Sequence, residues 1–224
     1  METTTRREIA LGWLKIAAGL AVFALGVHLT IFANIGLAPW DCLGMGIAGH
    51  TPLNYGLSMT AMSVVILLID LALGERIGFG TVIDALLTGN LVQLFNDLNP
   101  LPLNESLPAG VAIMLAGFVL MALGMMVYMR CAQGCGPRDS LLLGLGRRLS
   151  RVPIGVVEIG LWLLVVLAGW LLGGPVGIGT LISAFGAGAV MQLVYSAVRF
   201  EPRGIRQRSI AEAVRVLVGS GRNQ

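Results

Sequence analysis

The sequence has few charged residues, few aromatic residues and three cysteines, and each scarcity removes a class of protein. Only 12% of its 224 residues are charged, against about 25% in an average soluble domain, so the chain is too apolar to cover a water-soluble globule. Three cysteines make no disulfide framework, and no His–Cys cluster, phosphate-binding Gly-Lys-Ser/Thr loop or nucleophile–base pair is present. We therefore expect no cofactor, no metal site and no enzymatic activity.

The residues that are abundant are apolar. Hydrophobic residues make up 56% of the chain and the mean hydropathy is +0.83. Apolar runs long enough to cross about 30 Å of hydrocarbon at 1.5 Å per residue predict an all-α integral membrane protein. The six expected transmembrane helices are Ile9–Ala33, Tyr55–Leu73, Thr81–Phe95, Leu107–Met129, Ile154–Leu172 and Thr180–Val198.

Two further apolar segments are too short to cross the membrane. Asp41–Gly49 and Asp139–Gly146 each follow a turn that contains glycine and proline. We expect each to form a short re-entrant helix, which enters the membrane and returns to the same side.

The positions of the basic residues predict the orientation. If the N-terminus is cytoplasmic, the outer loops are residues 34–54, 96–106 and 173–179, which contain no Lys or Arg. All 15 basic residues then lie on or beside the cytoplasmic side, as the positive-inside rule requires. This placement explains the net charge of +3 without a nucleic-acid partner. We expect cytoplasmic ends at residues 1–8 and 201–224, the latter a basic amphipathic tail resting on membrane lipid.

The sequence indicates an internal duplication of one unit. Each unit, residues 9–106 and 107–200, has three expected spans; an odd number turns the second copy upside down. Inverted repeats with broken helices are typical of secondary transporters. The matching positions at shifts of 98 or 99 residues include Gly12, Gly19 and Gly26 with Gly110, Gly117 and Gly124; Pro39 and Asp41 with Pro137 and Asp139; Gly78 with Gly177; Gly89 with Gly188; and Gln93 with Gln192.

Two motifs resemble a known family. The segment Asn34-Ile-Gly-Leu-Ala-Pro-Trp-Asp41 and the Gly-x-Gly-Thr-x-Ile that opens the third span are similar to those of the YczE/YitT group of bacterial integral membrane proteins. The resemblance covers roughly residues 10–198 and implies a helical fold in the bacterial inner membrane. The group has no settled biochemical activity, so no substrate follows from it.

The two Pro-x-Asp motifs are the sharpest candidate site. Pro39 and Pro137 suit the first position of a helix, where a missing N–H is no loss. Asp41 and Asp139 then stand where a carboxylate can accept hydrogen bonds from the free N–H groups of the first turn. Two interpretations are open: the carboxylates only cap their helices, or the helix tips and the Asp pair form a substrate or proton site.

Several other polar residues lie within apolar segments and have two interpretations each. Gln93 and Gln192 either join helices or line a cavity. His28 either takes part in proton coupling or bonds to a neighbouring backbone group. Trp40 and Arg138 occupy the same slot of the two copies, which suits opposite membrane interfaces, although Arg138 could also bind an anionic substrate.

Three acidic residues have simple structural interpretations. Thr81-x-x-Asp84 reads as a capping box at the start of the third span. Asp70 and Glu158 lie near cytoplasmic ends of spans, where we expect them to reach the interface or to pair with nearby arginines.

The leading functional hypothesis is a small secondary transporter or permease with its site between the two Pro-x-Asp tips. If it is coupled to an ion, we expect the proton, through Asp41, Asp139 or His28, and a homodimer would thicken the wall around the pathway. The alternative is a non-transporting membrane regulator or assembly factor. A transporter predicts a polar cavity bounded by residues 36–41 and 134–139, whereas a scaffold predicts a filled interface there.

Overall fold

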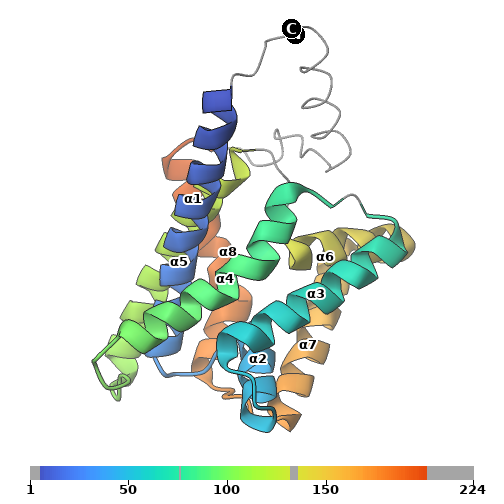
Figure 1. Cartoon of the computed structure of the whole chain (residues 1–224). Helices are drawn as coiled ribbons and strands as arrows, with labels where there is room; N and C mark the ends of the chain where they lie inside the picture. The colour runs from blue at the N-terminus through green and yellow to red at the C-terminus, as the bar shows by residue number, and fades with distance from the viewer. Residues whose placement is uncertain (1–5, 76, 132–135, 201–224) are drawn as a thin grey trace, which may run out of the picture.

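The computed structural model describes residues 6–75, 77–131 and 136–200, so the expected tail at 201–224 and most of the N-terminus at 1–8 lie outside the described residues. Within the described part the chain is entirely helical and contains no strand, as predicted. Its eight helices (Figure 1) are α1 (Arg6–Phe32), α2 (Pro39–His50), α3 (Tyr55–Leu73), α4 (Phe79–Leu98), α5 (Leu107–Met129), α6 (Pro137–Arg148), α7 (Ile154–Leu171) and α8 (Ile178–Ala197).

The helix ends follow local chemistry. α2 and α6 each begin with proline at the first helical position, where the missing N–H leaves no acceptor unsatisfied. The side chain of Asn54 caps α3 by accepting a 2.9 Å hydrogen bond from Leu57 N, and Gly74 ends it with φ +80°. The expected bounds of α3 and α5 are confirmed to the residue, and the other helices differ from prediction by at most three residues at either end.

Five of the described helices are long and apolar enough to cross a membrane: α1, α3, α5, α7 and α8. The remaining expected span, Thr81–Phe95, lies within α4, which has 20 residues but is more polar. Its polar side chains include those of Asp84, Asn90, Gln93 and Asn96. The sequence of long apolar helices indicates a multi-pass membrane protein.

α1 and α5 form the most intimate helix pair, and they run in opposite directions (Figure 1). A Cβ on Gly19 would lie 2.9 Å from Gly124 O, and one on Gly26 would lie 2.6 Å from Gly117 O. No side chain larger than hydrogen fits at these positions unless the backbones move apart. The stripe of glycines at seven-residue spacing is therefore the contact surface of the two helices.

The two short helices connect the rest of the bundle. α2 packs against α7 and α3, and α6 packs against α3 and α7. α4 packs against α1 and α3, while α8 packs against α5. α3 and α4 form a close pair, but no comparable contact joins α7 and α8 within the described chain. A core of buried residues from α1 to α4 and α6 fills the centre, including Val27, Cys42, Tyr55, Met59 and Leu141.

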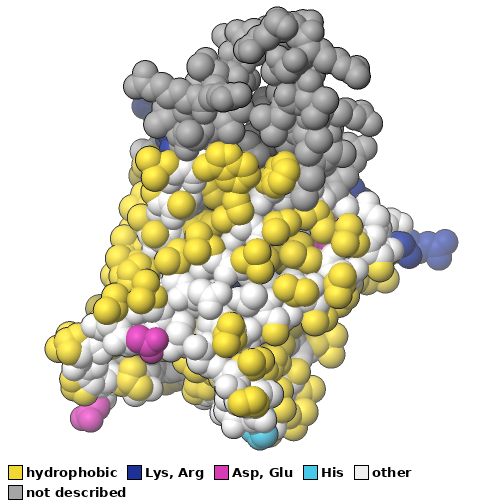
Figure 2. Space-filling model, viewed as in Figure 1, with side chains coloured by type: hydrophobic (Ala, Val, Ile, Leu, Met, Phe, Trp, Pro, Cys, Tyr) yellow, Lys and Arg dark blue, Asp and Glu magenta, His cyan; other side chains and the backbone are white. Residues whose placement is uncertain are grey.

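The outer surface is apolar, as a lipid-facing surface must be. In Figure 2, hydrophobic side chains cover much of the described face, the basic and His side chains in view lie at its edges, and only a few acidic side chains are seen. Leu171 is 70% exposed and Phe185 is 78% exposed, which would be unfavourable in water but not in hydrocarbon.

Candidate functional site at the tips of α2 and α6

The N-terminal tips of α2 and α6 meet. The Arg138 guanidinium carbon lies 5.5 Å from the centroid of the Trp40 ring, which is within cation–π range. Arg138 Nη2 also donates to Met59 Sδ at 3.8 Å. Membrane interfaces are about 30 Å apart, so the interpretation that placed Trp40 and Arg138 at opposite interfaces is wrong. The short helices point their N-termini at one another.

Asp41 stands inside the bundle at this junction. Its side chain is 4% exposed, and its Oδ1 accepts a 3.0 Å hydrogen bond from the Tyr55 hydroxyl. No side chain caps the N-terminus of α2. Asp41 is thus held by α3 rather than by the first turn of its own helix, although the partial positive charge of that turn still favours the carboxylate.

Asp139, the equivalent residue of α6, has a different environment. It is exposed, whereas Asp41 is buried, and no side chain caps α6 either. A Cβ built on Gly136 would lie 3.6 Å from Asp139 Oδ2 and 3.0 Å from Asp84 Oδ2, so two carboxylates flank the same glycine. A larger residue than glycine at position 136 would crowd the Asp84 carboxylate.

Asp84 is a member of the site that the sequence interpretation missed. The expected Thr81–Asp84 capping box is wrong, because Thr81 Oγ1 accepts from Gly78 N at 3.3 Å and caps α4 by itself. The Asp84 carboxylate instead accepts from the Thr88 hydroxyl one turn later and faces the tip of α6. Its equivalent in the second copy is Ser183, so sequence comparison of the copies gives no sign of a charged site.

The junction carries more negative than positive charge. Arg138 interacts electrostatically with Asp41, Asp84 and Asp139, and Glu158 of α7 adds a further carboxylate within range of Asp139. Among the described residues Arg138 makes no ion pair within 4 Å. One guanidinium shared by three carboxylates favours a cation or a proton at this junction over the anionic substrate that Arg138 alone suggested.

The remaining candidates lie away from the tips. Gln93 joins α4 to α3, since its Oε1 accepts from Gly56 N at 3.3 Å and its Nε2 donates to Asp97 at 2.7 Å. Gln192 is exposed and contacts only Ser196 of its own helix at 3.5 Å.

His28 has a side-chain partner instead of the expected backbone one. Its Nδ1 lies 2.6 Å from Asn96 Oδ1 of α4, between the rings of Phe32 and Phe95. The imidazole therefore fastens α1 to α4, and no hydrogen bond of the described residues connects it to Asp41 or Asp139.

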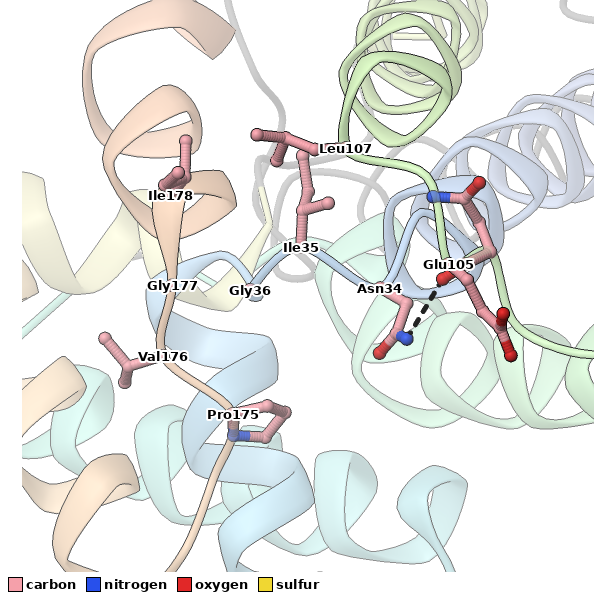
Figure 3. A pocket seen from close by; sticks show the side chains of 10 residues that line it. Asn34, Ile35, Gly36, Glu105, Leu107, Pro175, Val176, Gly177 and Ile178 are labelled. Carbon is pink, nitrogen blue, oxygen red and sulfur yellow. Dashed lines mark hydrogen bonds between the residues drawn. The ribbon is translucent and has the colours of Figure 1, made fainter.

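Two pockets of the described chain lie away from the junction of the tips. The first, of about 430 Å³, lies where the loop after α1 meets the loop before α8 (Figure 3), and its lining includes Asn34, Gly36, Glu105 and Gly177. The second, of about 370 Å³, lies at the far end of α6, beside Arg147 and Ile154. Residues 134 and 135 of the expected cavity lie outside the described residues. Neither of these two pockets lies between residues 37–41 and 136–139, where the Arg138 guanidinium meets the Trp40 ring.

The comparisons with known proteins agree with a membrane protein of this kind. Residues 10–196 match a family of unknown function, DUF6198. The chain belongs to this family. It is 29% identical to the uncharacterized membrane protein YczE of Bacillus subtilis, over 84% of this chain and 86% of YczE. The predicted YczE-type resemblance is thereby confirmed.

Two further relatives match over most of their length. An uncharacterized protein of Haemophilus influenzae is 32% identical over 77% of this chain and 78% of its own, and Bacillus subtilis YyaS is 29% identical over 81% and 90%. No solved structure matches the chain. Within the described part of this DUF6198 chain, no group of three or more His, Cys, Asp or Glu residues could hold a metal ion.

Proposed function

We propose that the protein is a small secondary transporter of the bacterial inner membrane, with six spans arranged as two inverted three-helix repeats. Its substrate would bind where the tips of α2 and α6 meet. The observation that supports this proposal most directly is the contact between Arg138 of one tip and Trp40 of the other, beside the buried Asp41 carboxylate. Oppositely inserted helix tips that meet inside a bundle are the arrangement on which substrate sites of inverted-repeat transporters are built.

The pairing of α1 with α5 supports an inverted repeat. At the shift of 98 residues Gly19 corresponds to Gly117 and Gly26 corresponds to Gly124. In space the partners are exchanged, because Gly19 meets Gly124 and Gly26 meets Gly117. Swapping the two copies therefore turns each contact into the other, as a two-fold axis between antiparallel helices requires.

The other helix contacts follow the same exchange. The contact of α2 with α7 corresponds to that of α6 with α3, and the contact of α1 with α4 corresponds to that of α5 with α8. In this arrangement α4 is the third span of the first copy. It pairs with α1 as α8 pairs with α5, although it is the more polar of the two helices.

The tips have to separate for a substrate to pass. A bis-methanethiosulfonate cross-linker that joins Trp40→Cys to Arg138→Cys should lock them, in a chain whose native cysteines are replaced. The linker spans the gap that the two long side chains leave, and it is attached through disulfide bonds that a reductant cleaves. We expect the lock to abolish uptake by proteoliposomes and a reductant to restore it. Uptake that persists in the fully locked protein would exclude a pathway through the junction.

The substrate can be found by thermal unfolding of the purified protein against metabolite and ion libraries. A ligand at 100 times its Kd stabilises the protein by about 2.7 kcal/mol, which is readily measured. We expect a ligand of the junction to stabilise the wild type but not Asp139→Asn, and to stabilise the outer-loop control Glu105→Gln fully. Finding no such ligand across broad libraries would count against transport.

The second candidate is a non-transporting regulator or assembly factor. It is favoured by one observation, the contact of the Arg138 guanidinium with the Trp40 ring, which joins the two tips directly. In that case the junction is only a structural joint. The Trp40–Arg138 lock would then leave every function of the protein intact, which separates the two candidates.

A further inference from the structure

Asp70 is a buried carboxyl that the helix-tip junction does not use. It lies on α3, one turn before the helix ends, and its side chain is 0% exposed. Neither carboxylate oxygen has a hydrogen-bond partner with acceptable geometry, although the Ser140 hydroxyl of α6 lies close to it. The expectation that Asp70 reaches the interface is therefore wrong, and among the described residues no arginine pairs with it.

An ionised carboxylate has no physical support in this position. A buried charge without a well-placed hydrogen-bond partner costs several kcal/mol, and membrane proteins keep such groups for function. A carboxyl that carries a proton is neutral and can itself donate to the Ser140 hydroxyl. The complete burial of Asp70 and the lack of a well-placed partner for either oxygen therefore favour the protonated acid over the anion.

Among the described residues, no charged group of the neighbouring helices forms an ion pair with Asp70. The helices packed against α3 are α2, α4 and α6. Arg147 of α6 pairs with Glu75, and Arg138 lies at the tips. The charged or titratable residues on these helices are Asp41, Cys42 and His50 of α2, Asp84 and Asp97 of α4, and Arg138, Asp139, Arg147 and Arg148 of α6.

Helix α6 connects Asp70 to the junction. Ser140, beside Asp70, follows Asp139 directly in the chain. One turn later, a Cβ on Gly144 would lie 3.0 Å from Leu73 Cδ1 and 3.1 Å from Glu75 Cγ. α6 is therefore pressed against α3 between Asp70 and the Glu75–Arg147 ion pair. Water can reach Asp70 along this side only if α6 moves.

We propose that Asp70 is a proton-binding site, and that its protonation holds α6 against α3 and its deprotonation accompanies movement of α6. Proton binding is independent of any substrate. The coupling of that proton to a transported solute rests on the proposed function.

Dicyclohexylcarbodiimide tests the proton directly, because this apolar reagent reacts with carboxyls that retain a proton in apolar surroundings. The proton moves to a carbodiimide nitrogen, an oxygen bonds to the central carbon, and rearrangement leaves a stable N-acylurea with no leaving group. We expect mass spectrometry of the full-length protein in lipid nanodiscs to find this adduct on Asp70 at about pH 6.5, at least about tenfold above Glu75, which is ion-paired.

Two variants make the result decisive. Asp70→Asn replaces the acid by a neutral isostere, so it should fold and lose this adduct. Glu75→Gln should keep the adduct on Asp70. Raising the pH should also lower the melting temperature of the wild type by about 3 °C more than that of Asp70→Asn. An unmodified Asp70 at pH 6.5, or equal pH dependence in the wild type and Asp70→Asn, would overturn the proposal.

The movement of α6 has its own test. Gly144→Leu places a side chain between α6 and α3, so it should expose Asp70 to water, favour its ionised form and lower the pH at which half of the adduct is lost. The matched change Gly146→Leu, whose Cβ meets only the flexible end of Ile154 at 3.2 Å, should leave that pH unchanged. If both variants lose half of the adduct at the same pH, protonation of Asp70 does not depend on the position of α6. A missing adduct together with a ligand that stabilises the tips would refute the proton site and leave the transporter standing.

Discussion

The helix pairs α3/α4 and α7/α8 are equivalent in sequence but differ in packing. Gly56 and Gly89 meet backbone to backbone, each Cβ position lying 3.0 Å from the other's carbonyl oxygen. Their counterparts Gly155 and Gly188 have no atom within 4 Å of the Cβ position. We call α3/α4, whose glycines touch, the closed pair, and α7/α8, whose equivalent glycines do not, the open pair. The same small residues are thus compatible with both arrangements.

The carboxylates at the two helix tips also differ between the two copies, in their exposure. Asp41, in the first copy with the closed pair, is 4% exposed and bonded to Tyr55, whereas Asp139, in the second copy with the open pair, is exposed. If the two copies are inverted repeats, a closed first copy and an open second copy describe one conformation of a transporter. The opposite conformation would arise when the copies exchange arrangements.

The largest expected effect is on cross-linking between the helices of each pair. Asn90 Nδ2 donates to Thr60 Oγ1 at 3.0 Å, so cysteines at positions 60 and 90 should cross-link almost completely without ligand. Cysteines at the equivalent positions, Ile159 and Ala189, should not. A stabilising ligand that changes the conformation should reverse the pattern, as measured by mass spectrometry of the linked peptides. Cross-links at 159 and 189 between two chains rather than within one would show instead that the open pair is a dimer interface.

The next effect is on stability. Gly89→Ala places a methyl group 2.6 Å from Met59 Cβ and 3.0 Å from a backbone oxygen, so we expect a loss of about 2 kcal/mol in the free energy of unfolding. Gly188→Ala meets nothing and removes a helix-weakening glycine, so it should gain up to about 1 kcal/mol. Thermal unfolding in the same detergent measures both. If the two variants lose stability equally, the α7/α8 pair is closed in solution.

The sequence predicts the elements of this fold better than their contacts. Long apolar runs with clear ends, as in α3 and α5, locate a helix to the residue, and the seven-residue glycine spacing of α1 and α5 marks their contact face. The positions of Asp84 and Asp70 depend on which side of α4 or α3 faces α6. Local sequence carries no information about that long-range contact, so it predicts a helix cap at Asp84 and an interfacial position for Asp70.

The same limit explains the Trp40–Arg138 pair. Each residue type suits a membrane interface by itself, and only the meeting of two re-entrant helices places them together. A duplicated sequence indicates that two such helices exist. It does not indicate how deeply they enter or whether they touch.

The two tips should respond differently to loss of a polar group. Tyr55→Phe removes the hydrogen bond to the buried Asp41, so we expect a loss of about 1.5–2 kcal/mol in unfolding free energy. Asp139→Asn should change stability by less than about 0.5 kcal/mol, because Asp139 is exposed. The double variant Tyr55→Phe/Asp41→Asn should recover part of the loss, since the remaining amide is neutral. A destabilised Asp139→Asn would mean that the second tip is as closed as the first.

The smallest expected effect distinguishes the two glutamines. Gln93 bridges α3 and α4 by accepting from Gly56 N and donating to Asp97, so Gln93→Leu should cost about 1 kcal/mol by leaving a partly buried N–H without a partner. Gln192 makes one long contact within α8, so Gln192→Leu should be neutral. In the exchanged conformation, however, Gln192 would meet Gly155 N as Gln93 now meets Gly56 N. A ligand that closes α7/α8 should therefore stabilise the wild type more than Gln192→Leu, and an equal response would refute the exchange.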